Sequence, residues 1–390
     1  MIDSLDFDYP TGFNTPIVDT LPVPQVSATG LAEDAGIKWW CIEGGTEVLT
    51  NTMNNSLKTK PLYSHRVTSV SMSNPNDPAT TMNITVAGHP EFSKREYSHV
   101  VSTVPFSCLR TIDLTGCVLD YKQRMALRCL NYGAGVKVGI KFKTRWWQHD
   151  PKFTQQVGGV SSTDRQSRVV VYPSYGLNDP VDAPGVLIAA YNWFVSRTFT
   201  THACNIDPMV VLRTQDAFRF GSLVQSKDWS EREDPQREHP DSEVFLLQQV
   251  YDDLAAIHGQ TPEWYKRETL DYFAYDWYDN QYTMGAFALF GPGQFSNLYP
   301  SVTIPAARGN LHFGGEAAST HHAWISGALD SAYRCVHEIL TKEKTARLHK
   351  FLKKYGESKV LKGEKTAELQ VLRGIYAKEL EEAEMKRKNA

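Results

Sequence analysis

A glycine turn between an apolar strand and a helix is the stretch best suited to hold a ligand. Residues 313–334 read FGGEAASTHHAWISGALDSAYR, a pattern that predicts a short strand, a turn and a helix running on to Leu340. Residues 326–328 at the helix start are small, so backbone N–H groups there could face a ligand with negative charge. Glu316 could accept hydrogen bonds from sugar hydroxyls. The alternative is a packing unit whose turn carries a carboxylate.

A lysine on a predicted strand is a second candidate for chemistry. Apolar residues at every second position of 136–142 face one way, and Lys137 faces the other. Such a lysine is either solvated or points at a reacting group. Its neighbours, a glycine-rich start at 133–135 and the pair Trp146–Trp147, favour the functional interpretation.

The glycine turn resembles the C-terminal flavin motif of the amine oxidase family, and most closely that of the L-amino acid oxidases. FGGE at 313–316 resembles the family's FAGE, and HAWI at 322–325 resembles its HGWI. Gly314 and Ala323 depart from the pattern, each a small residue replacing another. The resemblance implies that this turn binds FAD.

Three further segments resemble L-amino acid oxidases in particular. GGVSSTD at 158–164 and SRVVVYP at 167–173 are similar to GGxSTTD and SRxxYYP. Residues 276–287, together with 293–295, are similar to the family's W…QYxMGA…F segment, which lies beside the flavin. These matches indicate amino-acid substrates rather than amines in general.

The resemblance assigns roles to individual residues. Lys137 is expected to be catalytic, holding a water against flavin N5, and Tyr191, near the end of a strand at 185–193, to donate its hydroxyl to the substrate carboxylate. For each of these residues a purely structural alternative exists: the lysine could be solvated on the surface, the aromatic residues could belong to the core, and the glycines named below could be ordinary turn residues. The substrate-binding set is Tyr191, Trp277, Gly285 and Trp324, and the cofactor-binding set is Gly44, Gly45, Val67, Gly315, Glu316, Trp324 and Ile325.

The activity implied is FAD-dependent oxidative deamination of L-amino acids to a 2-oxo acid, ammonia and hydrogen peroxide, with molecular oxygen as the second substrate. Within the same class, a monoamine oxidase or an amino-acid monooxygenase shares most of these positions. From another class, a non-catalytic fragment or binding subunit is the alternative.

A flavoprotein of this kind is expected to contain a strand, GxGxxG and a helix that binds the pyrophosphate, and the sequence shows no such fingerprint. The resemblance therefore covers about residues 35–342, the C-terminal portion of the family's fold. The chain is expected to be a truncated product, or to work with an N-terminal partner chain or as a homo-oligomer.

These elements predict an α/β (α+β) fold, in which part of a Rossmann-like FAD-binding domain is interleaved with a mixed-sheet substrate-binding domain. An irregular segment is expected at 1–34 and a charged helical tail at 343–390. The FAD-binding domain is expected to consist of residues 35–115 and 305–342, and the substrate-binding domain of residues 116–304. A helix is predicted at 242–257, with Asp241 or Ser242 as its N-cap and Gly259 as its C-cap.

Composition bounds the remaining possibilities. The 390 residues carry a net charge of -3, and no basic stripe suggests nucleic acid. Six scattered cysteines have neither disulfide nor zinc spacing, and no metal site is expected. No apolar run is long enough to span a bilayer. The compartment, cytoplasmic or secreted, stays open.

Overall fold

The structure is a computed structural model that describes residues 42–153, 156–194, 223–224, 241–290, 294–319, 322–344 and 346–356. The expected irregular segment at 1–34 lies outside the described residues. So do residues 357–390, which hold most of the expected helical tail, and Gly293 of the match at 276–287 and 293–295.

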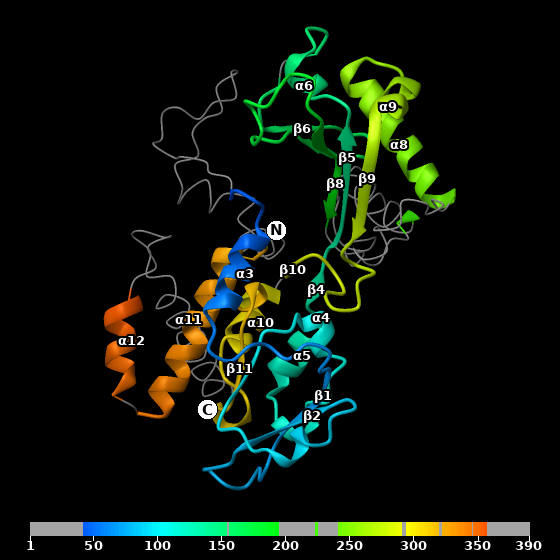
Figure 1. Cartoon of the computed structure of the whole chain (residues 1–390). Helices are drawn as coiled ribbons and strands as arrows, with labels where there is room; N and C mark the ends of the chain where they lie inside the picture. Colours follow the sequence, from blue (N-terminus) through cyan, green and yellow to red (C-terminus); the bar gives the residue numbers. More distant parts are fainter. Residues whose placement is uncertain are drawn as a thin grey trace. The chain divides into compact units, whose positions relative to one another are not determined.

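The chain divides into two compact units. Figure 1 labels helices and strands of both units. The described residues of unit 1 fall in 62–132 and 287–356, and those of unit 2 fall in 42–61 and 133–286. The chain leaves unit 1 after Tyr132 and returns at Phe287, so the units are interleaved in sequence. The predicted α/β (α+β) class is confirmed, while the domain boundaries drawn from the sequence stay a prediction.

Unit 1 contains short strands and helices around one apolar core. Its elements are β1 (Val67–Met72), β2 (Met82–Val86), η2 (Phe92–Lys94), β3 (Val100–Ser102), α4 (Phe106–Leu109), η3 (Thr115–Cys117), α5 (Tyr121–Cys129), β4 (Asn131–Tyr132), β10 (Ala288–Leu289), α10 (Gln294–Val302), η6 (Ala307–Gly309), β11 (Leu311–Phe313), η7 (Glu316–Ala318), α11 (Ile325–Lys342) and α12 (Arg347–Tyr355).

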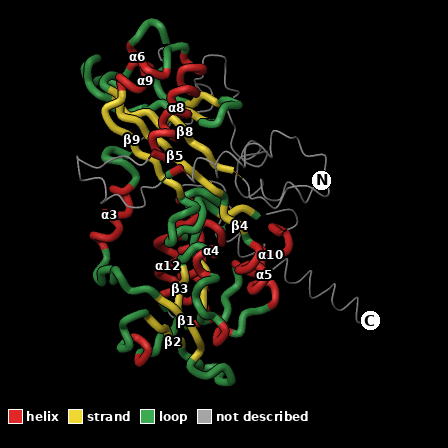
Figure 2. The backbone as a smooth tube through the Cα atoms, turned by 90° about the vertical axis from the view of Figure 1, so that its right-hand side faces the viewer, coloured by secondary structure: helices red, strands yellow, loops and turns green. Residues whose placement is uncertain are grey.

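Three strand pairs organise unit 1. β1 and β2 form an antiparallel hairpin (Figure 2), and β10 pairs antiparallel with β4. β11 pairs in parallel with β3, more than 200 residues earlier, with Leu311 opposite Val100 and Phe313 opposite Ser102. This parallel pair leads directly into the glycine turn and α11, the strand, turn and helix order that the sequence predicts.

Several predicted elements of unit 1 are shorter than expected. The alternation of apolar and polar residues over 63–72 predicts a strand, but β1 begins only at Val67, because residues 63–64 form a turn in which Ser64 has a φ of 60°. The family resemblance predicts a second strand at 97–104, but β3 is limited to Val100–Ser102. The resemblance also predicts a turn at 105–107, but this segment starts α4, with Pro105 at its N-cap, where the missing N–H costs no helical hydrogen bond.

Unit 2 is built on one five-stranded sheet with the order β6-β7-β8-β5-β9. Every pairing in it is antiparallel. Its elements are α3 (Glu47–Ser56), β5 (Ala134–Phe142), α6 (Trp146–His149), β6 (Val160–Ser162), β7 (Val169–Val171), β8 (Gly185–Phe194), α8 (Asp241–His258), α9 (Pro262–Glu268) and β9 (Thr269–Asp276).

The two faces of this sheet differ as the sequence predicts. Val136, Val138, Ile140 and Phe142 are buried in the apolar core of unit 2, which also contains the inner face of α8. Lys137 lies on the opposite face and is only partly buried. The alternation of the sequence is therefore sufficient to set which face of β5 meets the core.

The long helix predicted at 242–257 is confirmed as α8. Asp241 and Ser242 lie within its first turn rather than at the N-cap. Gly259 ends it as predicted, since its φ of 81° allows its N–H to donate to the Ala255 carbonyl at 2.8 Å.

Candidate functional site

The glycine turn, defined here as residues 314–319, is held at both of its glycines. The Gly314 N–H donates to the Ser102 carbonyl at 2.8 Å, which continues the parallel pairing past the end of β11. The Gly315 N–H donates to Ser331 Oγ at 2.8 Å. Gly315 has φ 112° and ψ 172°, a conformation restricted to glycine. The turn is thus fixed to β3 on one side and to α11 on the other.

Glu316 is presented by this turn as a partly buried carboxylate. Its Oε1 accepts the Ala288 N–H at 3.0 Å and its Oε2 accepts the Ala323 N–H at 3.0 Å. Burial raises the pKa of Glu316, and the two backbone N–H groups oppose that rise. Each carboxylate oxygen can accept more than one hydrogen bond, so Glu316 retains capacity for a hydroxyl donor.

The start of α11 is exposed and lacks a side-chain cap. Trp324 is its N-cap and makes no capping hydrogen bond, and the first intrahelical donor is the Ala328 N–H, 3.2 Å from the Trp324 carbonyl. Trp324 is 47% exposed and Ile325 is 53% exposed. Backbone N–H groups at 325–327 therefore precede the helical ladder, where an acceptor with negative charge is favoured.

A second cluster lies on unit 2, where Lys137 stands between two tyrosines. It is directly opposite Tyr191 on β8 and Tyr275 on β9, so all three side chains share one face of the sheet. Lys137 Nζ lies 4.5 Å from the centroid of the Tyr191 ring. Burial lowers the pKa of Lys137 and raises the pKa of Tyr191, so both groups are held toward their neutral forms.

The strand that carries Tyr191 is anchored by the loop between β6 and β7. The Tyr191 N–H donates to the Ser167 carbonyl at 3.2 Å. Ser167 is itself fixed, because its N–H and its hydroxyl both donate to Asp253 Oδ2 of α8 at 2.8 Å. Arg165 Nε donates to the other oxygen of Asp253 at 2.7 Å. The matching SRVVVYP segment therefore contributes to the site by holding β8 in place.

Trp277 and Gly285 close a turn beside the same cluster. The Trp277 N–H donates to the Gly135 carbonyl at 2.9 Å, and the Gly285 N–H donates to the Trp277 carbonyl at 3.0 Å. The Trp277 ring packs edge-on against Tyr275, with centroids 4.7 Å apart. Gly285 has a φ of 132°. Trp277 thus adjoins the face that holds Lys137, with Tyr275 between them.

The structure sorts the expected residues into two sets. Lys137, Tyr191, Trp277 and Gly285 belong to unit 2, and so do Gly44 and Gly45, which form a left-handed turn before α3 with φ values of 81° and 89°. The unit 1 set is Val67, Gly315, Glu316, Trp324 and Ile325.

Val67 begins β1 beside a β-bulge. The functional roles of all these residues stay predictions.

Sequence reasoning missed two residues of these clusters. Tyr275 could have been found from the alternation of Phe273, Tyr275 and Trp277 along β9, which puts three aromatics on one side. Arg334 gave no such signal, although it donates hydrogen bonds to the Phe313 carbonyl before the glycine turn and to the Ala318 carbonyl within it. The apolar periodicity of α11 predicts that its apolar residues, and not Arg334, face the core.

Two absences hold within the described ranges. Across 42–356, apart from the gaps given above, no three His, Cys, Asp or Glu side chains are grouped to hold a metal ion. None of the helices in the described part of the chain has the length and apolarity that a membrane span requires.

Residues 27–218 and 220–340 match the family described as flavin containing amine oxidoreductase. The chain belongs to this family. The predicted resemblance is thereby confirmed, with L-amino acid oxidases among the amine oxidoreductases that it resembles. A flavin-dependent oxidoreductase is the class of enzyme that this family represents.

Similar amine oxidoreductases are about twice as long as this chain. L-amino-acid oxidase 4 of Hebeloma cylindrosporum is 39% identical over 363 residues, covering 90% of this chain and 52% of the relative. An L-glutamate oxidase precursor of Streptomyces viridosporus is 24% identical over 379 residues, covering 77% of this chain and 50% of the relative. The chain therefore spans about half the length of these curated relatives.

The fold of the family is seen in a solved structure of a putrescine oxidase bound to putrescine. It superposes with a TM-score of 0.52 at 18% identity, covering 76% of this chain and 53% of that one. At this identity the similarity establishes the shared fold and nothing about the substrate.

Proposed function

We propose that this chain is the C-terminal portion of an FAD-dependent L-amino acid oxidase, which converts an L-amino acid to a 2-oxo acid, ammonia and hydrogen peroxide. The observation that carries the proposal is the position of Lys137 opposite Tyr191 on a partly open sheet face. The phenol could donate a hydrogen bond to a substrate carboxylate, and the neighbouring lysine amine could hold a water and move protons at it. Similar relatives named as L-amino-acid oxidase and L-glutamate oxidase support this substrate class.

The glycine turn and the start of α11 suit a flavin. Glu316 would accept hydrogen bonds from sugar hydroxyls, and the backbone at Trp324 and Ile325 would face the anionic edge of the ring system. Gly315 has no side chain and a backbone conformation that other residues avoid, which leaves space beside the carboxylate. When bound, FAD supplies the two-electron oxidation that amino-acid side chains cannot perform.

Lys137 would hold a water and move protons at that water. A lysine whose pKa burial has lowered can donate hydrogen bonds and, in its neutral form, accept a proton. Tyr191 would donate its hydroxyl to the substrate carboxylate, and its raised pKa keeps that proton in place. Trp277 and Gly285 would bound the substrate side chain on unit 2, excluding water from the reacting carbon.

A second candidate function is that of a subunit that needs an N-terminal partner chain. It is favoured by α3, which has no buried residue and exposes Val48, Met53 and the neighbouring Leu57. The length of the relatives supports the same view. In this form the oxidase activity would belong to the assembled pair.

The product of the reaction distinguishes the proposal from its alternatives within the class. The purified chain, alone and mixed with the N-terminal half of the Hebeloma relative, would be incubated with FAD and a panel of L-amino acids. Hydrogen peroxide together with a 2-oxo acid supports the oxidase. An amide with carbon dioxide would indicate a monooxygenase, and turnover only of amines lacking a carboxylate would indicate a monoamine oxidase.

Two lysines on one face of β5 provide a matched pair for this assay. Lys137→Met removes the proposed catalytic amine, and Lys141→Met removes an exposed lysine two side chains further along the same face. We expect peroxide formation to fall by at least about a hundredfold in Lys137→Met and to be retained in Lys141→Met. Equal losses in both variants would contradict the role of Lys137.

A further inference from the structure

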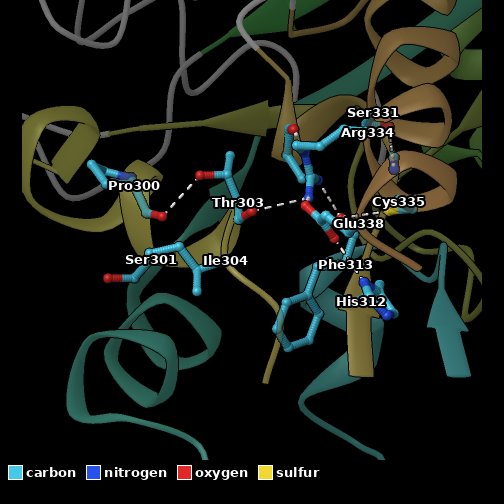
Figure 3. A network of polar contacts seen from close by, with 12 residues as sticks. Pro300, Ser301, Thr303, Ile304, His312, Phe313, Ser331, Arg334, Cys335 and Glu338 are labelled. Atoms are coloured by element: carbon cyan, nitrogen blue, oxygen red, sulfur yellow. Dashed lines mark hydrogen bonds and ion pairs between the residues drawn. The ribbon is translucent and has the colours of Figure 1, made fainter. Parts of the chain in front are cut away.

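Arg334 of α11 is buried, at 1% exposure, and Figure 3 draws it with Thr303, Phe313 and Glu338. Its Nη2 donates to the Phe313 carbonyl at 2.5 Å and to the Ala318 carbonyl at 3.4 Å. Phe313 immediately precedes the turn, and Ala318 follows Glu316 within it. One guanidinium group thus bridges the two sides of the segment that presents the Glu316 carboxylate.

The other terminal nitrogen of Arg334 fixes the guanidinium itself. Nη1 donates to the Thr303 carbonyl at 3.0 Å, just after α10, and to Glu338 Oε1 at 2.6 Å. The planar, forked donors of an arginine can hold several carbonyls at a set spacing, which the single ammonium of a lysine cannot do. The contacts of Arg334 therefore link β11, the turn, α10 and α11 through one rigid group.

Glu338 is also fixed in place. Its Oε2 accepts a hydrogen bond from His312 Nδ1 at 2.7 Å, and His312 is 1% exposed. His312 Nε2 lies 3.1 Å from His99 Nδ1, and His99 Nε2 lies 2.9 Å from Glu343 Oε1. Glu338, the counter-charge of Arg334, is consequently part of a connected polar network that joins α11 to His312 of β11 (Figure 3). Through His99 this network also reaches Glu343, the C-cap of α11.

The burial pattern of α11 separates this arrangement from ordinary core packing. The helix buries Asp330, Ser331 and Arg334 together with Gly327 and Cys335, while the large apolar residues Leu329 and Val336 are 44% and 41% exposed. Ser331, on the buried face, accepts the hydrogen bond of the Gly315 N–H. The buried face of α11 therefore carries three polar side chains, two of which hydrogen-bond to the backbone of the glycine turn.

We propose that Arg334 is a positioning residue for Glu316, setting the conformation of the glycine turn through the Phe313 and Ala318 carbonyls. The inference rests on the proposed function in one respect, namely that Glu316 faces a flavin. Its structural part, the control of the turn by Arg334, is independent of any cofactor. The two parts are therefore tested by separate measurements.

The first measurement is amide hydrogen exchange of residues 314–319, at a temperature well below the unfolding midpoint. Arg334→Lys keeps a positive charge opposite Glu338 but loses the fork. The control is Arg110→Lys, which alters an exposed arginine of the same unit whose Nη2 donates to the single Leu130 carbonyl at 2.9 Å. We expect exchange in the turn to accelerate by at least about tenfold in Arg334→Lys and to be unchanged in Arg110→Lys.

The second measurement is FAD affinity, read from quenching of flavin fluorescence and from the visible band of the bound flavin. Arg334→Lys is expected to weaken binding by at least about tenfold, and Arg110→Lys to leave it unchanged. If Arg334→Lys does not fold, Glu338→Gln replaces it, because this substitution removes the counter-charge at nearly constant volume. Glu338→Gln is likewise expected to accelerate amide exchange in residues 314–319 and to weaken FAD binding.

Normal exchange and normal FAD affinity in the variant would overturn the proposal. Faster exchange with unchanged FAD affinity would overturn its link to Glu316. A wild-type chain that binds no FAD, even with the N-terminal half of the relative, while the variant still exchanges faster, would refute the proposed function and support the positioning role.

Discussion

Lys137 and Tyr191 lie directly opposite each other on β5 and β8, with the lysine Nζ 4.5 Å from the centre of the phenol ring. Both residues come from neighbouring strands of one sheet, whose buried side is fixed by the apolar residues of β5. Their mutual position follows from strand register alone. Substitutions at Lys137 and Tyr191 therefore test whether this face of the unit 2 sheet takes part in the reaction.

Tyr191→Phe tests the proposed carboxylate contact. Loss of a hydrogen bond to a charged group costs about 1.5–3 kcal/mol, so we expect KM for L-amino acids to rise about ten- to a hundredfold with a smaller change in kcat. Tyr175→Phe is the control, since Tyr175 is 62% exposed and lies in the loop after β7. An unchanged KM in Tyr191→Phe would remove Tyr191 from the substrate site.

Lys137 also makes a prediction about stability and pH. The ordinary pKa is 10.5 and burial lowers it in the folded state. At pH values below the lowered pKa, Lys137 is charged in both the folded and the unfolded protein, so the folded protein carries the full free-energy cost of burying the charge. Between the lowered pKa and 10.5 the folded protein loses this proton first, and the free energy of unfolding rises with pH. Lys137→Met is therefore expected to be more stable than wild type at neutral pH, by an amount that shrinks as the pH approaches 10.5.

Urea unfolding of both proteins from pH 7 to 10.5 measures this difference directly. Lys141→Met serves as the exposed control and is expected to show a small difference that does not vary in the same way. A Lys137→Met difference that stays constant across the range would contradict the lowered pKa.

His258, at the end of α8, predicts acid sensitivity. Burial lowers its pKa from 6.5 to about 4, and His258 Nε2 shares a hydrogen bond of 2.6 Å with the hydroxyl of Tyr172, whose pKa burial raises. Above pH 6.5 the ring is neutral in both states. As the pH falls from 6.5 to about 4 the unfolded state gains a proton first, so stability is lost, by at most about 3 kcal/mol and less where water reaches the ring.

His258→Gln retains a hydrogen-bond acceptor for Tyr172 and cannot titrate. We expect it to remove most of this stability loss between pH 6.5 and 4, whereas His89→Gln, in unit 1, should leave the loss in place. Unfolding free energies measured across that range decide the matter. An unaltered acid limb in His258→Gln would show that another group is responsible.

The two adjacent glycines of the turn are expected to respond differently to alanine. Gly315 has a φ of 112°, so Gly315→Ala should cost about 1–3 kcal/mol. At Gly314 an added Cβ would meet Thr103 Cγ2 at 3.4 Å and Cys335 Sγ at 3.6 Å, ordinary contact distances. Gly314→Ala should therefore change the free energy of unfolding by less than about 0.5 kcal/mol. Equal effects of the two substitutions would contradict this description of the turn.

Local sequence patterns predict much of this fold, but they do not predict the contacts between segments that are far apart in the sequence. Alternation identifies β5 and its lysine face, and the apolar repeat with Gly259 identifies α8. The apolar repeat of α11 predicts a helix correctly, but the structure buries its polar side and exposes Leu329. Hydrophobic periodicity does not reveal a helix face selected for hydrogen bonds to a turn.

The candidate site was predictable to a similar extent. Motif resemblance identified Glu316 and Lys137 as single residues. It could not indicate that Tyr275 shares the face of Lys137, since that follows from the register of β5 against β9 across more than 130 residues. The pairing of His99 with His312 is a contact of the same kind, formed only when β3 and β11 align.

The most direct test of the central claim is anaerobic bleaching of bound flavin. The chain would be incubated with FAD, alone and with the N-terminal half of the Hebeloma relative, freed of unbound cofactor, and titrated with an L-amino acid, its D-enantiomer and the matching amine. We predict a bound flavin spectrum that only the L-amino acid bleaches, with Lys141→Met behaving like wild type. Absence of bound flavin in both preparations, or bleaching by the amine alone, would contradict the proposed function.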